Sequence, residues 1–187
     1  MGIFATRPIS VGRRARRAQA AAWVSASVLV AGVMVSAGPE TARAAPEPSG
    51  LPIPRFVTLR AEEANMRTGP GEQYPIKWTY QRAGLPVEVV AEYHTWRRIR
   101  DWQGTEGWMH SSMLSGRRSI MVIGEVHPLH ASADAQSRIL AEVEPKVTGQ
   151  LESCPAGGAW CRVKIDNVKG WLKRTDVWGV YPGETVE

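Results

Sequence analysis

The sequence predicts an all-β protein made of two small β-barrels in tandem, preceded by an N-terminal export signal. From residue 55 onwards, short runs of β-branched and aromatic residues alternate with Gly, Pro and Asp turns. No apolar pattern of helical period interrupts these runs. The order of landmarks in the first half of this region then recurs in the second half at a nearly constant spacing, which is typical of a tandem repeat.

Residues 1–44 have the three parts of an export signal. An arginine-rich segment at residues 13–17 precedes an apolar or small-residue stretch at residues 20–38. Ala42, Arg43 and Ala44 then fit the small-x-small rule, which predicts cleavage between Ala44 and Ala45. The alternative is an uncleaved membrane anchor, because the apolar stretch approaches the length needed to span a bilayer.

The formal net charge of +5 does not indicate a nucleic-acid partner. Residues 1–44 contain six arginines and one glutamate, and the chain has 23 basic and 18 acidic residues in all. The remaining residues therefore carry 17 charges of each sign. Without a basic surface in the folded part, the electrostatic case for nucleic-acid binding is lost.

Residues 45–54 contain four prolines and are predicted to form an extended linker. The first barrel is assigned to residues 55–116, with strands around residues 56–59, 64–67, 74–80, 87–93 and 96–100. Period-two alternation places Val87, Val89, Ala91 and Tyr93 on one face. The residues Gly69-Pro70-Gly71 are typical of a turn, and the two glycines are expected to adopt positive φ.

A divergent second barrel is assigned to residues 117–184. Pro128-Leu129-His130 follows Asn65-Met66-Arg67 at the same offset by which Gly170-Trp171-Leu172 follows Gly107-Trp108-Met109. Trp160 follows Trp96 at nearly the same offset. The second copy replaces the Gly-Pro-Gly loop with residues 131–134. In both copies the tryptophan after glycine, Trp108 or Trp171, is predicted to lie in the core.

These residues resemble the bacterial SH3-like (SH3b) domain family. The resemblance rests on the entrance motif at residues 65–70, on residues 74–76, Gly84, Trp96 with Ile99, and on residues 104–112. The second copy, with its ending at residues 178–184, is similar to tandem exported SH3-like proteins of proteobacteria. The resemblance implies small, strongly bent β-barrels that bind cell-wall peptides or other extracytoplasmic ligands.

Cys154 and Cys161 are the two cysteines of the chain. An even count at close spacing in an exported protein predicts a structural disulfide. Two free thiols and a metal pair are the alternatives. The histidines have no matched acid nearby in sequence, and the combination of His127, His130 and the two cysteines fits no standard zinc spacing. We therefore expect no catalytic residue, no metal and no cofactor.

Strand parity indicates a candidate binding surface. Ile99 is expected to point inward, so Trp96 shares the outward face with Arg98 and Arg100; Trp160 takes the corresponding position in the second copy. A flat apolar surface beside cationic groups suits a ligand. The alternative is that these tryptophans only pack at the end of the barrel. The predicted ligand-contacting residues are Tyr74, Trp96, Arg98, Arg100, Trp102 and Trp160.

The resulting hypothesis is a non-catalytic binding protein of the cell envelope, periplasmic or secreted. Its ligand would be a peptide or a peptidoglycan stem in a groove lined by Tyr74, Trp96 and Trp102, with Arg98 and Arg100 pairing with ligand carboxylates. The rival hypothesis is a structural or protein-interaction module that supports an envelope complex. After signal cleavage neither hypothesis includes a membrane span or a nucleic-acid partner.

Overall fold

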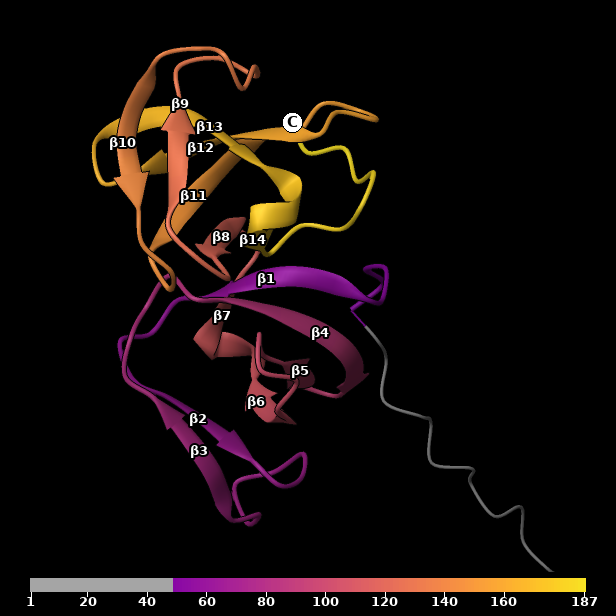
Figure 1. The fold of residues 1–187 in the computed structure, drawn as a ribbon. Helices are drawn as coiled ribbons and strands as arrows, with labels where there is room; N and C mark the ends of the chain where they lie inside the picture. The colour runs from indigo at the N-terminus through magenta and orange to yellow at the C-terminus, as the bar shows by residue number, and fades with distance from the viewer. Residues whose placement is uncertain (1–48) are drawn as a thin grey trace, which may run out of the picture. The chain divides into compact units, whose positions relative to one another are not determined.

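The computed structural model describes residues 49–187 (Figure 1). The predicted signal and its cleavage site at Ala44 and Ala45 lie outside these residues. All regular elements from residue 49 onwards are β-strands or single 3-10 turns, as the sequence predicts. Within this range, no helix is long and apolar enough to cross a membrane.

The first sheet contains seven strands in the order β3-β2-β6-β5-β4-β1-β7. A 3-10 turn, Ser111–Met113, connects β6 to β7. Every pairing within this sheet is antiparallel. The strands are β1 Arg55–Leu59, β2 Ala64–Arg67, β3 Ile76–Tyr80, β4 Pro86–Tyr93, β5 Trp96–Arg100, β6 Glu106–His110 and β7 Leu114–Ser115.

The second sheet repeats this order as β10-β9-β13-β12-β11-β8-β14. Each strand of the first sheet thus has a counterpart seven strands later, which confirms the tandem repeat. A second 3-10 turn, Arg174–Asp176, precedes its last strand. The strands are β8 Ser119–Val122, β9 His127–His130, β10 Ile139–Val143, β11 Thr148–Ser153, β12 Trp160–Ile165, β13 Val168–Lys173 and β14 Val177–Trp178.

Each barrel has its own apolar core, filled by inward residues of alternating strands. Met66, Val89, Ile99 and Met109 are fully buried in the first. In the second barrel, Leu129, Leu151, Val163 and Leu172 take the corresponding positions. The predicted inward parity of Ile99 is confirmed, and Val163 and Ile165 have the same inward parity in the second barrel.

Two parity predictions were wrong. The register between β4 and β5 shifts between Val89 and Ala91, and this bulge turns the end of β4 over. Tyr93 is therefore 44% exposed instead of inward. Trp108 and Trp171 are only half-buried, because the buried glycine before each and the Met109 or Leu172 after each form the inward face.

The glycines before these tryptophans are required by close strand crossing. A Cβ on Gly107 would lie 2.5 Å from Met66 Cγ and 2.8 Å from the Arg67 carbonyl oxygen. A Cβ on Gly170 would lie 2.5 Å from Leu129 Cγ. In both barrels the side chain that would be struck is the central core residue of the crossing strand. The Gly-Trp repeat is therefore a packing signature.

The predicted disulfide between Cys154 and Cys161 is present, with both residues fully buried. It closes the loop between β11 and β12. The backbone of Cys154 also pairs with Val186 through two hydrogen bonds, from Cys154 N to Val186 O and from Val186 N to Cys154 O. The disulfide thus lies where the C-terminal segment joins the second barrel.

The two barrels pack together through buried groups. Only residues 116–118 separate β7 from β8. Thr58 Oγ1 donates to the Arg117 carbonyl at 2.6 Å and lies 2.7 Å from Ser119 Oγ. Met121 of β8 packs into the core of the first barrel. The barrels therefore share apolar as well as polar contacts.

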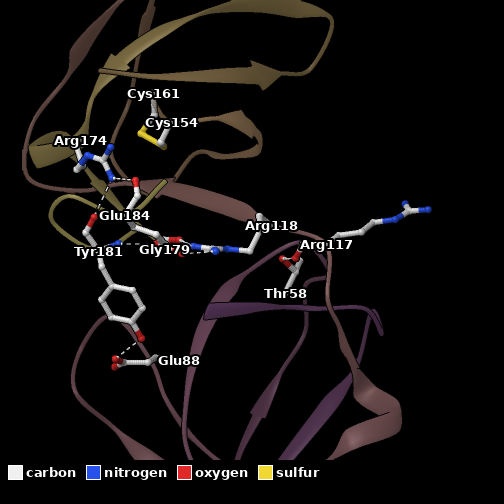
Figure 2. Close-up of polar contacts among 10 residues, drawn as sticks. All are labelled: Thr58, Glu88, Arg117, Arg118, Cys154, Cys161, Arg174, Gly179, Tyr181 and Glu184. Carbon is white, nitrogen blue, oxygen red and sulfur yellow. Dashed lines mark hydrogen bonds and ion pairs between the residues drawn. A yellow bond between two sulfur atoms is a disulfide. The ribbon is translucent and has the colours of Figure 1, made fainter. Parts of the chain in front are cut away.

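The segment after β14 completes this interface (Figure 2). The Tyr181 hydroxyl donates to Glu88 Oε1 at 2.7 Å, and the Tyr181 ring packs on Phe56 with centroids 4.6 Å apart. Glu184 pairs with Arg118 at 2.6 Å, while Arg174 donates to the carbonyls of Tyr181 and Glu184. Burial and the bond to Glu88 raise the pKa of Tyr181. The predicted ending of the repeat is therefore a docking segment for the first barrel.

Residues 49–54, the described part of the proline-rich linker, are attached to the first barrel. Ser49 donates to Glu92 through its backbone N–H at 2.7 Å and its hydroxyl at 2.8 Å, and Arg55 pairs with the same carboxylate. Burial acts to raise the pKa of Glu92, but the hydrogen bonds from Arg55 and Ser49 outweigh it and lower the pKa to about 2.

Reduction of the disulfide should destabilise the second barrel. Opening a loop of this length should lower the free energy of unfolding by about 2–3 kcal/mol. Urea unfolding with and without reductant measures the difference. The reductant has no other target, since the chain contains only these two cysteines. An unchanged unfolding midpoint would contradict the prediction.

The Glu92 carboxylate should make stability fall in acid. Its pKa is lower in the folded than in the unfolded chain, so its contribution is complete above pH 4.5 and is lost as the pH falls from 4.5 towards 2. Glu92→Gln should cost about 2 kcal/mol at neutral pH and flatten the pH dependence in that window. Urea unfolding across this acid range and at neutral pH tests this, with Glu142→Gln, an exposed residue, as control. Equal acid sensitivity in both variants would disprove the assignment.

Candidate ligand-binding site

Arg67 organises the loop between β2 and β3. Its guanidinium Nη1 donates to the backbone carbonyls of Glu72 at 3.0 Å and Tyr74 at 2.8 Å. The loop is further closed by the bond from Thr68 N to Pro75 O at 3.0 Å. The entrance motif thus has two functions: Met66 fills the core, and Arg67 holds the loop that displays Tyr74.

The two loop glycines are needed for space and not for positive φ. The expectation of positive φ was wrong, because neither Gly69 nor Gly71 has it. Instead, a Cβ on Gly69 would lie 2.4 Å from Tyr74 Cδ1, and one on Gly71 would lie 2.3 Å from Gln73 Oε1. The absence of a side chain at Gly69 lets the Tyr74 ring lie directly against the loop backbone.

The second barrel closes the equivalent loop with different chemistry. In the repeat, His130 takes the position of Arg67, and Ser137 takes the position of Tyr74. His130 Nδ1 lies 3.3 Å from the carbonyl oxygen of Ser137. The Ser137 hydroxyl donates to the carbonyls of Ser132 and Asp134. In both barrels, therefore, the last residue of the second strand contacts the backbone carbonyl at the equivalent loop position, Tyr74 or Ser137. Only the first barrel has an aromatic ring at that position.

A strip of exposed apolar side chains runs from this loop along β3. Tyr74, Ile76 and Trp78 are 39%, 50% and 58% exposed. Because β3 is the terminal strand of its sheet, one of its two backbone edges has no strand partner among the described residues. An apolar strip beside an open strand edge suits an extended chain that adds to the sheet.

This strip is largely absent from the second barrel. The equivalents of Tyr74, Ile76 and Trp78 are Ser137, Ile139 and Ala141. Ile139 alone keeps a large exposed side chain. The sequence predicts a strand at Trp78 but not the exposure of its side chain, because a period-two pattern does not reveal which strand lies at a sheet edge.

Trp96 and Trp160 are half-buried and pack against neighbouring strands. The Trp96 ring meets His110 edge-on with centroids 5.5 Å apart. The Trp160 ring meets His130 at 5.1 Å, and Lys173 Nζ lies 5.8 Å from its centre. These contacts agree with the packing alternative, while leaving part of each ring in solvent.

Arg98 and Arg100 share the outward face of β5, and both have carboxylate partners within the chain. Arg98 pairs with Glu106 at 2.6 Å, and Arg100 pairs with Glu88 at 2.5 Å. Bonding to Glu88 raises the pKa of Arg100. Since Glu88 is 3% exposed, the Arg100 pair belongs to the barrel interface, whereas the Arg98 pair is accessible to a ligand.

The structure does not place Trp96 and Trp102 in one groove. They flank opposite ends of β5, whose five extended residues span about 13 Å. Trp102 is half-buried against the core of the first barrel. Its turn is held by Asp101 Oδ1, which accepts from the N–H groups of Gln103 and Thr105. Tyr74 is part of the separate β2–β3 loop.

Tyr80 and Asp101 form the buried polar pair beneath this turn. The Tyr80 hydroxyl donates to Asp101 Oδ2 at 2.9 Å. Burial, together with the Asp101 charge, raises the pKa of Tyr80, so the phenol stays protonated. The pair therefore holds β3 to the β5–β6 turn.

The histidines and cysteines do not form a reactive cluster within residues 49–187. Both cysteines are joined in the disulfide, which removes the four-ligand metal alternative with His127 and His130. His127 Nδ1 lies 3.4 Å from Asp176 Oδ2, and His110 Nδ1 lies 2.7 Å from Ser112 Oγ. No group of three or more potential metal ligands occurs in this part of the chain.

Comparison with protein families decides the identity of the two barrels. The profile of the bacterial SH3 domain matches twice, at residues 60–116 and 124–179. The chain belongs to the bacterial SH3 domain family. Each match covers one barrel from its second strand onwards, β2 to β7 in the first and β9 to β14 in the second. Membership in this family and the disulfide together favour a location outside the cytoplasm.

Other comparisons add little to this bacterial SH3 protein. The curated proteins contain no match. Among solved structures, NlpC1 from Trichomonas vaginalis has 7% identity and a TM-score of 0.32, over 73% of this chain and 49% of that one. NlpC2 from the same organism has 8% identity and a TM-score of 0.32, over 68% and 48%. The chain thus spans about half the length of these structures, and the values are too low to carry an inference.

Arg67→Ala should loosen the aromatic loop of the first SH3 barrel. Loss of its two bonds to backbone carbonyls should cost about 1 kcal/mol and speed hydrogen exchange at Thr68 and Tyr74. Amide exchange followed by NMR measures this. Arg138→Ala is the control, because Arg138 is an exposed arginine of the second barrel, outside this loop. If both variants exchange alike, Arg67 does not hold the loop.

Proposed function

We propose that this protein is a non-catalytic binding protein of the cell envelope, periplasmic or secreted, that holds an extended peptide on its first SH3 barrel. The proposed ligand class is the peptide stem of peptidoglycan. The proposed contact surface is the strip Tyr74, Ile76 and Trp78. Membership in the bacterial SH3 domain family supports the general role of a cell-envelope binding module.

The observation that carries the proposal is the difference between the two barrels at this strip. Both have the same strand order, and in both a side chain at the end of β2 or β9 contacts a backbone carbonyl of the following loop. The first barrel exposes two aromatic rings and an isoleucine, whereas the second has Ser137, Ile139 and Ala141. Exposed aromatic side chains do not stabilise the folded chain by burial, so their presence in one copy supports a binding role.

The edge position of β3 supports an extended peptide as the ligand. A peptide that lies along β3 can bond to the free backbone edge, and its alternate side chains can contact Ile76 and Trp78. Aromatic contacts of this kind supply much of the energy of binding. Lys77, between the two apolar residues, donates to the Glu106 carbonyl and braces the strand from its other face.

Arg98 is the arginine that supports recognition of a carboxylate. Its pair with Glu106 is half-exposed on the arginine side, and exposed pairs contribute little to stability. A ligand carboxylate can therefore replace Glu106 at small cost. Arg100 is committed to the buried Glu88, which makes it a structural residue in this proposal.

Titration with soluble muropeptides, followed by amide NMR shifts, tests the proposal. Shifts are expected at Tyr74, Ile76 and Trp78. Trp78→Ala and Ile76→Ala should each weaken binding by about tenfold, because each removes apolar contact area. Ile139→Ala is the matched control, since it removes a similarly exposed isoleucine from the equivalent strand of the second barrel.

The rival role as an interaction scaffold predicts a different result. Unchanged amide NMR shifts at Tyr74, Trp78 and Trp96 with millimolar muropeptide would contradict the proposal. A comparison of pull-downs then distinguishes the two roles. Retention on sacculi that is lost in Trp78→Ala supports the peptide-binding role, whereas capture of one protein partner without retention on sacculi supports the scaffold.

A further inference from the structure

A second surface with ligand-binding chemistry lies between the two barrels, away from the aromatic strip. It is a cleft of about 620 Å³ bounded by the ends of β1 and β7, the connecting residues 116–118, and strands β11 and β12. This volume lies within the range of sites that hold small ligands. None of the residues of the aromatic strip contributes to it.

The cleft is strongly basic. Arg60, Arg117, Arg118 and Lys164 line it, against the single carboxylate of Asp166. Arg118 is neutralised by Glu184. Within residues 49–187, the other three cations make no ion pair: Arg60 donates to the Ser112 carbonyl, and Arg117 and Lys164 have no side-chain hydrogen bond. Figure 2 shows the Arg117 side chain extending away from the paired groups of the interface.

The repeat explains why Lys164 has no partner. In the first barrel Glu88 lies opposite Arg100 across β4 and β5, and the two form an ion pair. In the second barrel the strand register places Gln150 opposite Lys164. The cation has been kept while its carboxylate has become a neutral amide, and both side chains line the cleft. The second barrel thus adds to the lining a lysine that makes no ion pair within residues 49–187, although its charge helps to lower the pKa of the nearby Glu152.

The walls of the cleft are held in place across the barrel interface. Thr58 contacts Ser119 and the Arg117 carbonyl at its base. Arg82 reaches from the first barrel to Thr148 Oγ1 at 3.2 Å and the Lys146 carbonyl at 3.3 Å. A charged cleft whose walls are already fixed loses little freedom when a ligand binds.

We propose that this cleft binds a low-molecular-mass polyanion that carries at least two carboxylate or phosphate groups. The forked guanidinium groups of Arg60 and Arg117 bind the anionic oxygens in pairs, and Lys164 contacts a second anionic group from the opposite wall. The Gln150 amide and the hydroxyl groups of the rim offer further hydrogen bonds. Asp166, which also lines the cleft, repels anions and weakens binding.

Calorimetric titration of the purified protein with pyrophosphate and with tricarballylate tests this site. At least one probe should bind with a Kd of about 1 mM or lower at low ionic strength. Tighter binding of pyrophosphate would identify phosphate as the natural group, and tighter binding of tricarballylate would identify carboxylate. If neither probe gives a heat of binding at about 10 mM, the proposal is overturned.

Variants separate a specific site from general charge attraction. Arg117→Ala and Lys164→Ala should each weaken binding by about tenfold, and Asp166→Asn should strengthen it. Arg138→Ala removes the same charge from a position outside the cleft and should leave binding unchanged. Equal losses in Arg117→Ala and Arg138→Ala, or no gain in Asp166→Asn, would overturn the site. Muropeptide binding at Trp78 should be unaffected, so failure of this site and failure of the proposed function are distinguishable.

Discussion

The buried carboxylate of Glu88 is the group on which the arrangement of the two barrels depends. Arg100 of the first barrel donates to one of its oxygens, and Tyr181 of the C-terminal segment donates to the other. A buried carboxylate is costly unless it is paired, so each barrel supplies a partner that the charge requires. Tyr181 also packs on Phe56, which combines a directional bond with apolar burial at the same point. Polar and apolar contacts therefore join the two barrels at this point.

The fold can be predicted from the sequence to a large extent, because its signals are local and occur in both copies of the repeat. Gly107 and Gly170 mark the same crossing, and Ile99 and Val163 mark the same inward parity. The errors arise where a local rule meets a long-range contact. The bulge between Val89 and Ala91 moves the Tyr93 side chain to the outer face of the sheet. In β6, Met109 and not Trp108 is buried in the core. A period-two pattern cannot show either effect, because both depend on how a neighbouring strand pairs.

The candidate site was less accessible to sequence reasoning. The outward parity of Arg98 and Arg100 was predicted, but their partners Glu106 and Glu88 lie on other strands, so the pairing follows only from the strand register. The sequence does not identify Trp78 as a binding residue, since its exposure results from the place of β3 at the end of the sheet order. The replacement of Glu88 by Gln150 has meaning only when the two registers are compared.

Arg67 and His130 close the β2–β3 and β9–β10 hairpins in the same way. In both barrels one side chain at the end of the strand contacts the carbonyl oxygen at the far end of the loop, and the intervening sequence is free to differ. A backbone bond does not depend on which side chain the loop displays. The two barrels therefore share one way of closing this loop, and the side chains on the loop differ between them while the core positions correspond.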